Sequence, residues 1–199
     1  MTDEVLVTRH LQGDPEAFNL LAERHQELIY RVALRFLGNH EDALDAVQEV
    51  LLRLLRSLPR FRGESRFTTW LYRLAANTAI DLHRQRQSRV QPVAVDPDQT
   101  VEAPNSDPDH QCETAFREHL LNEALKQMEE SQRLLLVLRD REGLTNEEVA
   151  DILGIKVGTL KARLHRARGA LRRLLESGVQ VEGRGVQGRF VLTANGLAE

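Results

Sequence analysis

Apolar residues recur at helical spacing along this chain, and the alternation typical of strands is absent from the first 175 residues. Between Glu41 and Ser57, large apolar side chains follow one another in steps of three and four residues, which places them on one stripe of a helix. We expect that stripe to consist of Leu44, Val47, Leu51, Leu54 and Leu58. The pattern predicts an all-α fold.

Capping residues mark the ends of the helix that precedes this stripe. Asp14 followed by Pro15 is typical of a helix start, with Asp14 as the N-cap and Pro15 in the first helical position. A long helix is therefore expected through Phe36. Gly38 and Asn39 follow directly and are expected to stop it.

A third helix completes the expected N-terminal domain, which we place at residues 1–90. Pro59 ends the striped helix, and the loop FRGESRF follows it. Either Thr68 or Thr69 is expected to cap the next helix, which runs through WLYRLAANTAIDLHRQ.

An acidic, proline-rich segment at residues 91–112 interrupts the helical pattern. It holds four of the six prolines and contains no lysine or arginine. Such a composition neither sustains a helix nor buries apolar surface. We therefore predict a flexible linker between the N-terminal domain and a C-terminal domain at residues 113–176.

The C-terminal domain has the pattern of a helix-turn-helix. Thr145 and Glu148 form a capping box that opens the short helix EEVADILG. Gly154 permits a tight turn, and a basic helix is expected from about Val157 to Leu175. Two helices joined by a short turn, with the second one basic, are typical of DNA-binding domains. Helices are also expected over residues 113–129 and 131–141.

The tail at residues 177–199 is rich in glycine and shows some alternation. It is compatible with disorder or with a small hairpin, and the pattern assigns it no role.

The net charge of -3 conceals an uneven distribution of charge along the chain, in which a basic segment, an acidic segment and a second basic segment follow one another. Between Arg60 and Arg89, seven arginines face only two acidic residues, and no acidic residue lies between Lys156 and Arg173. Since binding a polyanion requires local positive charge, both basic blocks are candidates for nucleic-acid contact, and the acidic linker lies between them.

Composition also excludes several classes of function. Cys112 is the only cysteine, so neither an intramolecular disulfide nor a cysteine-only metal site can form. No secretory leader and no apolar run of about 18 residues is present, and we expect a soluble cytoplasmic protein. No Ser/His/Asp set, phosphate loop or His-Cys cluster appears, so no enzyme activity, cofactor, metal site or small-molecule substrate is expected.

The final helix is the strongest candidate for reading DNA. One side is apolar and the other is basic, and an arginine can bind guanine through two hydrogen bonds. The alternative is a solvated basic face on a structural helix. The apolar side holds Leu160, Leu164, Ala167, Leu171 and Leu174, while Lys161, His165, Arg166, Arg172 and Arg173 lie elsewhere.

Two segments of the N-terminal domain have both a functional and a purely structural interpretation. Opposite the leucine stripe, Leu52 lies among polar residues and is either a lone exposed leucine or an anchor for a protein partner. The loop before the third helix combines arginines with aromatic residues that can stack on unpaired bases. For Trp70 and Leu74 we favour a place in the core.

Two runs carry a specific resemblance to a known family. DALDAVQEVLLRLLRSLPRFRGESRFTTWLYRLAANTAID resembles region two of extracytoplasmic-function sigma factors, and LRDREGLTNEEVADILGIKVGTLKARLHRARGAL resembles their region four. The resemblance covers the chain from about Asp3 to Glu176. It implies that region two binds the clamp helices of RNA polymerase and opens and reads the minus-ten element. Region four would read the minus-thirty-five element as duplex and contact the polymerase flap.

The resemblance assigns roles to individual positions. The clamp-binding surface corresponds to Asp45, Gln48, Glu49 and Leu52, which favours the partner interpretation of Leu52. The minus-ten residues correspond to Arg62, Gly63, Glu64, Ser65, Arg66, Phe67 and Asn77. The minus-thirty-five residues correspond to Thr159, Lys161, Arg163, His165 and Arg166. Lys161 and His165 stand where arginine and an aromatic residue are frequent in the family.

The implied partners are core RNA polymerase, promoter DNA as duplex and as melted strand, and an anti-sigma factor. The main alternative is a helix-turn-helix regulator that is not a polymerase subunit, and it predicts a stable dimer on duplex DNA. A third hypothesis, an enzyme acting on nucleic acid, lacks a catalytic constellation.

Overall fold

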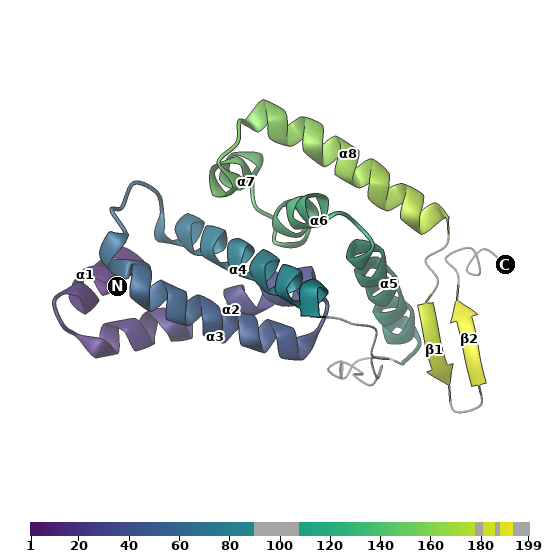
Figure 1. Cartoon of the computed structure of the whole chain (residues 1–199), viewed down its shortest axis with the longest axis horizontal. Helices are drawn as coiled ribbons and strands as arrows, with labels where there is room; N and C mark the ends of the chain where they lie inside the picture. Colours follow the sequence, from purple (N-terminus) through teal and green to yellow (C-terminus); the bar gives the residue numbers. More distant parts are fainter. Residues whose placement is uncertain (90–107, 178–180, 186–187, 193–199) are drawn as a thin grey trace.

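The computed structural model describes residues 1–89, 108–177, 181–185 and 188–192. Its body is helical, which confirms the expected fold class (Figure 1). The N-terminal bundle consists of α1 (Asp3–Leu11), α2 (Pro15–Leu37), α3 (His40–Ser57), the short turn η1 (Leu58–Arg60) and α4 (Phe67–Arg89). The C-terminal helices are α5 (Pro108–Lys126), α6 (Glu130–Leu136), η2 (Val137–Arg141), α7 (Asn146–Leu153) and α8 (Val157–Glu176).

The ends of α2 are set by the residues that the sequence indicates. The Asp14 carboxylate accepts a hydrogen bond from the Glu16 N–H at 3.0 Å, and Pro15 is the first helical residue. Gly38 has a φ of 71°. This left-handed conformation costs glycine little and ends the helix after Leu37.

The predicted stripe of α3 is confirmed at Leu54 and Leu58, which are 0% exposed, and is wrong at its N-terminal end. Leu44 is 44% exposed, and Val47 and Leu51 are only half-buried. Large side chains had suggested the stripe, but α3 turns a face with two alanines toward the rest of the bundle. That buried face consists of Asp42, Ala43, Ala46, Val50 and Leu54.

The expected cap of α4 was also wrong, because the helix begins at Phe67, ahead of both Thr68 and Thr69. Its first turn is closed by a hydrogen bond from the Trp70 N–H to the Arg66 carbonyl at 3.2 Å. The Phe67 ring is 1% exposed and lies 5.8 Å from the Phe61 ring. Burial of this ring therefore accompanies the start of the helix.

Most of the predicted linker, residues 91–107, lies outside the described residues. Its last part differs from the prediction, since α5 begins at Pro108 rather than near Glu113. Proline is well tolerated in the first helical position, where no intrahelical partner for its nitrogen is needed.

The capping box of α7 is confirmed. The Thr145 Oγ1 accepts from the Glu148 N–H at 3.2 Å, and the Thr145 N–H donates to the Glu148 carboxylate at 2.9 Å. The Thr145 N–H and the Thr145 hydroxyl both donate to the Glu148 carboxylate and thereby lower the pKa of Glu148. The turn after α7 contains Gly154, and α8 then starts at Val157 as expected.

The helix expected over residues 131–141 is not uniform. It begins as α6 and continues as η2, a segment of π-helix in which the Glu142 N–H donates to the Val137 carbonyl at 2.9 Å. This spacing of five residues makes the turn wider than an α-helical turn. The wide turn is a feature that periodicity does not reveal.

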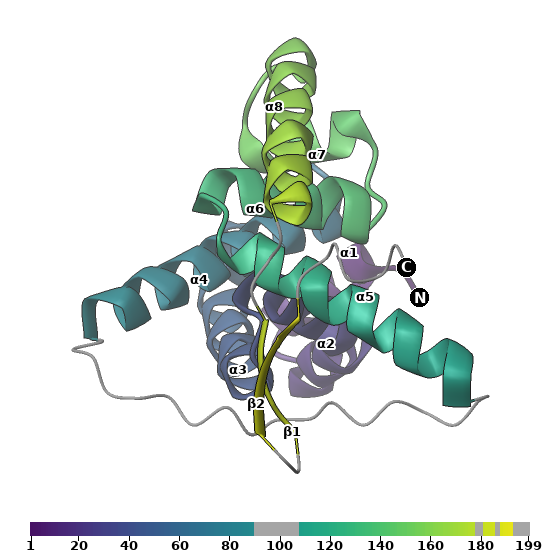
Figure 2. The same ribbon diagram turned by 90° about the vertical axis from the view of Figure 1, so that its right-hand side faces the viewer.

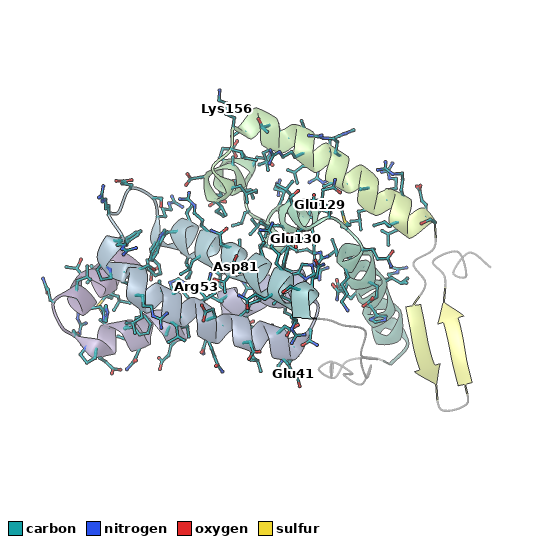
Figure 3. The ribbon with its side chains drawn as sticks, in the orientation of Figure 1. Glu41, Arg53, Asp81, Glu129, Glu130 and Lys156 are labelled. Carbon is teal, nitrogen blue, oxygen red and sulfur yellow. The ribbon has the colours of Figure 1, made fainter. Side chains whose placement is uncertain are left out.

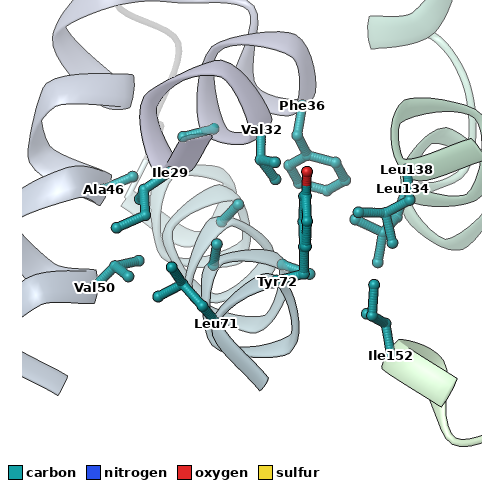
Figure 4. Close-up of a cluster of buried hydrophobic side chains, with 14 of the residues drawn as sticks. Ile29, Val32, Phe36, Ala46, Val50, Leu71, Tyr72, Leu134, Leu138 and Ile152 are labelled. Atoms are coloured by element: carbon teal, nitrogen blue, oxygen red, sulfur yellow. The ribbon is translucent and has the colours of Figure 1, made fainter. Parts of the chain in front are cut away.

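The N-terminal bundle and the C-terminal helices share one apolar core. Figure 4 shows Phe36 of α2 and Tyr72 of α4 facing Leu134, Leu138 and Ile152 across the boundary between the two parts. All five side chains are at most 8% exposed. The described parts therefore pack against each other as one body.

The tail contains the hairpin that the sequence offered as one of two alternatives. Strand β1 (Val181–Gly185) pairs antiparallel with β2 (Gly188–Leu192), with Val181 opposite Leu192. In Figure 2 this hairpin extends away from α8, beyond α5.

Candidate nucleic-acid interface

The basic face of α8 is presented to solvent. Leu160, Leu164 and Ala167 are buried against the other C-terminal helices, with exposures of 0%, 4% and 0%. The helix is thereby fixed in rotation, and all the minus-thirty-five candidates on it lie outside. Those exposed residues are Thr159, Lys161, Arg163, His165 and Arg166.

One ion pair connects this helix to η2. The Arg168 guanidinium donates to both carboxylate oxygens of Asp140 in η2, at 2.6 and 3.0 Å. Arg163 lies close enough to Glu129, at the start of α6, to help the Ser131 hydroxyl lower the pKa of that carboxyl. Arg168 is thus engaged within the protein. Figure 3 shows Lys156 at the outer end of α8, pointing away from the bundle.

The loop before α4 carries its arginines on the outside and its aromatic residue on the inside. Arg62, Gly63, Glu64 and Arg66 are exposed, and Ser65 is half-buried. The backbone of Gly63 has a φ of 70°, so the shape of the loop depends on a residue without a Cβ.

Phe67 does not lie on that surface. It packs between the rings of His25 and Trp70, at centroid distances of 5.3 and 5.9 Å, and serves as the base of the loop. Trp70 and Leu74 are half-buried against the core, in agreement with the interpretation favoured for them. Asn77, further along α4, is exposed.

The outward face of α3 is apolar in the middle and polar around it. Leu52 is 48% exposed, and Asp45 and Gln48 beside it are exposed too. Sequence reasoning missed Leu44 and Leu55, which are 44% and 40% exposed. The spacing of three residues from Leu52 to Leu55 was the signal that could have revealed this larger patch.

Glu49, the fourth predicted residue of this face, is held by a neighbour. Its carboxylate accepts from Arg53 at 2.7 Å, and Arg53 also donates to Asp81 of α4 at 2.7 Å. Both carboxylates raise the pKa of Arg53. Figure 3 shows Arg53 and Asp81 where α3 meets α4, so Glu49 borders the exposed face rather than occupying its centre.

Among the described residues, no group of three or more His, Cys, Asp or Glu side chains could hold a metal ion. None of the helices in the described ranges is long and apolar enough to cross a membrane.

Comparisons with known proteins agree with this geometry. The family described as Sigma-70 region 2 matches residues 21–89, and the family described as Sigma-70, region 4 matches residues 118–171. An ECF RNA polymerase sigma-E factor of Escherichia coli strain K12 is 36% identical over 181 residues, which cover 86% of this chain and 93% of the relative.

Two solved structures are similar over most of their length. CnrH, in complex with the cytosolic domain of CnrY, has a TM-score of 0.64 and 25% identity, with 88% of this chain and 97% of the other covered. The sigma factor RpoE in complex with the anti-sigma factor NepR from Bartonella quintana has a TM-score of 0.61 and 25% identity, with coverages of 80% and 96%.

Proposed function

Because the chain belongs to the ECF RNA polymerase sigma factors, we propose that it binds core RNA polymerase and directs transcription initiation at specific promoters. The observation that best supports this function is the basic face of α8, which is exposed to solvent. Burial of Leu160, Leu164 and Ala167 on the opposite side of the helix keeps this face directed outward. It lies inside the match to region 4.

In this proposal the two parts of the chain divide the work. Residues 1–90 form the region 2 domain, which binds polymerase through the outward face of α3. The same domain binds the melted minus-ten strand through the loop at residues 62–66, which packs on the buried Phe67, and through Asn77. Residues 108–176, from the start of α5, form the region 4 domain, which reads the minus-thirty-five duplex through α8. Residues 91–107 connect them as a linker, and residues 177–199 are left without a role.

The partners follow from the same family. They are core polymerase, promoter DNA as duplex and as melted strand, and an anti-sigma factor, as in the related complex of RpoE with NepR. The protein would act in the cytoplasm by differential binding, without chemistry, cofactor or small-molecule substrate. A regulator independent of polymerase is set aside, since the relatives are sigma factors.

Run-off transcription tests the proposal directly. Core polymerase with this protein should produce discrete transcripts from a library of genomic fragments, and core polymerase alone should not. A protein that shifts duplex DNA as a dimer but yields no transcript with core polymerase would overturn the proposal and restore the independent regulator.

The loop gives a separate prediction. Arg62→Ala combined with Arg66→Ala should reduce promoter opening by roughly tenfold or more, because two exposed cations that can hold the melted strand are lost. Permanganate reactivity of thymines around the minus-ten element measures this opening, and core binding should be unchanged.

The control for this variant is Arg60→Ala, which removes an exposed arginine just before the loop. It should leave opening close to that of the unaltered protein. Normal thymine reactivity in the double loop variant would show that the melted strand is held elsewhere.

A further inference from the structure

His25 of α2 is a buried polar ring that lies beneath the loop before α4. It is 6% exposed, and its ring centroid is 5.3 Å from that of Phe67, with 48° between the two ring planes. Phe67 is 1% exposed and is the first residue of α4, directly after the loop at residues 62–66. His25 therefore forms part of the wall against which this loop is anchored.

Aromatic rings hold the loop at both of its ends. Phe61 precedes the loop and Phe67 follows it, and their rings lie 5.8 Å apart and nearly perpendicular, at 85°. The Trp70 ring packs against both of them, at 5.1 Å from Phe61 and 5.9 Å from Phe67. Tilted and edge-to-face pairs at these distances are favourable. The positions of Arg62 and Arg66, the exposed cations at the two ends of the loop, thus depend on where these rings lie.

The first residue of α1 determines how the His25 ring is oriented. The Asp3 carboxylate, which is 15% exposed, has one oxygen 3.0 Å from Nε2 of His25. Because an ionised carboxylate only accepts, the Nε2–H of His25 is the donor. The other oxygen of Asp3 accepts from the Arg24 guanidinium at 2.6 Å, and the Arg24 side chain is 41% exposed. Asp3 thus has one buried partner and one partner at the surface.

The two partners of Asp3 should respond differently when its carboxylate is lost. The Arg24 guanidinium can be hydrated, so its pair with Asp3 contributes little. The buried Nε2–H of His25 has no such alternative, because an unpaired buried donor keeps its full desolvation penalty. His25 would have to turn toward solvent to recover a hydrogen bond, and its ring would then leave Phe67.

The helix α1 has other contacts that keep it on the bundle. Leu6 and Val7 are 0% and 4% exposed, and α1 also contacts η1, the turn before the loop. In Figure 1, α1 lies at the same end of the bundle as the segment between η1 and α4. Apolar contacts therefore attach the helix, and the hydrogen bond from His25 to Asp3 is left to set the position of the ring.

We propose that Asp3 and His25 are positioning residues for reading the melted minus-ten strand, and that they act through Phe67 on the shape of the loop at residues 62–66. This inference rests on the proposed function for the effect on the promoter, but the connection from α1 to the aromatic base of the loop is independent of it. Asp3 precedes the residues that match Sigma-70 region 2, which begin at 21. The proposal gives α1, a helix without an assigned role, a part in promoter opening.

The only tryptophan of the chain reports on the aromatic base directly. Trp70 is half-buried against Phe61 and Phe67, so its fluorescence depends on how tightly these rings pack. Asp3→Ala should raise the constant for quenching of Trp70 by acrylamide by about twofold, because a loosened base admits the quencher. Circular dichroism checks that the helices persist.

Promoter opening measures the consequence for the loop. Asp3→Ala should lower the permanganate reactivity of thymines around the minus-ten element by roughly 5-fold or more, the change in equilibrium that an unpaired buried donor causes. Binding to core polymerase should be unchanged, since Asp3 lies on α1 and the proposed polymerase surface lies on α3. A general loss of folding would instead lower both measurements.

Three further variants separate the hydrogen bond from the charge of Asp3. Asp3→Asn removes the charge but keeps an oxygen that can accept from His25, so quenching and opening should stay close to those of the unaltered protein. Arg24→Ala is the matched control, because it removes the exposed partner of Asp3 and should leave both measurements unchanged. Adding His25→Phe to Asp3→Ala places a ring against Phe67 without a buried donor, so both measurements should recover.

Three results would contradict the proposal. Unchanged quenching of Trp70 in the Asp3→Ala variant would overturn the connection from α1 to the loop. Altered quenching with normal opening would overturn the positioning role. If Asp3→Asn and Arg24→Ala are both as impaired as Asp3→Ala, the ion pair rather than His25 causes the effect. If the unaltered protein gives no transcript with core polymerase, the sigma function fails, and the quenching results still decide whether α1 is connected to the loop.

Discussion

Gln48→Lys combined with Leu52→Asp should abolish binding to core RNA polymerase while leaving the helical fold intact. Both side chains lie on the outward face of α3, and Leu52 is 48% exposed there, so neither contributes to the core of the bundle. Exposed substitutions of this kind change stability by at most about 0.5 kcal/mol.

The loss of binding should be much larger. An apolar residue at the centre of an interface typically contributes about 2 kcal/mol or more, and two charges placed there should weaken binding by about 30-fold at least. Co-purification with core polymerase and a titration by fluorescence anisotropy measure this loss. Circular dichroism checks that the helices persist.

A matched control is available on the other helices of the bundle. Val5→Asp with Gln26→Lys makes the same changes in side-chain character at exposed positions of α1 and α2, and Val5 is 47% exposed. This variant should co-purify normally. If the α3 variant also co-purifies normally, the polymerase contact lies on another surface.

Arg166→Ala and Arg173→Ala should impair promoter recognition in different ways. Both arginines are exposed on α8, and a separation of seven positions in the sequence places them on nearly the same side of the helix, about 10 Å apart. Arg166 lies nearer the start of α8, where side chains of a recognition helix reach base edges. The Arg173 guanidinium lies back over Gly169, and we propose that it contacts the phosphate backbone.

The expected losses follow from these positions. Arg166→Ala should cost roughly 1 to 3 kcal/mol and relax the preference at one or two minus-thirty-five positions. Arg173→Ala should weaken binding similarly across all sequences and reduce the salt dependence by about one phosphate contact.

A randomised minus-thirty-five library, transcribed at two salt concentrations, distinguishes the two effects. The comparison is internal, since the same residue type is removed from the same helix in both variants. If both variants lose activity evenly and no position changes its preference, α8 contributes charge alone and specificity resides elsewhere.

Local features of this fold were predictable from the sequence, because their causes lie within a few residues. Asp14 caps α2 through the Glu16 N–H, and Thr145 and Glu148 cap α7 through each other. The amphipathic pattern of α8 likewise identified its exposed basic residues, since burial of Leu160 determines which side faces outward.

Features that depend on distant contacts were not predictable. The first half of the α3 stripe was missed because Ala43 and Ala46, rather than Leu44, face the bundle there, which only the packing of neighbouring helices decides. Phe67 belongs to the loop motif in sequence but to the core in space. Glu142 contacts Arg31, which is 111 residues away, and no local pattern connects the two.

The π-helical turn makes the chain intolerant of changes in length at one place. Deleting one residue from Val137–Arg141 would restore ordinary α-helical hydrogen bonding, but it would rotate everything that follows by about 100° and shift it by about 1.5 Å. The three charged residues at the end of the turn would then point away from the side chains that they contact on three helices. These pairs are Asp140 with Arg168 of α8, Arg141 with Glu118 of α5, and Glu142 with Arg31 and Arg35 of α2. Substitutions here remove one contact at a time, whereas a shortened turn would disconnect three helices at once.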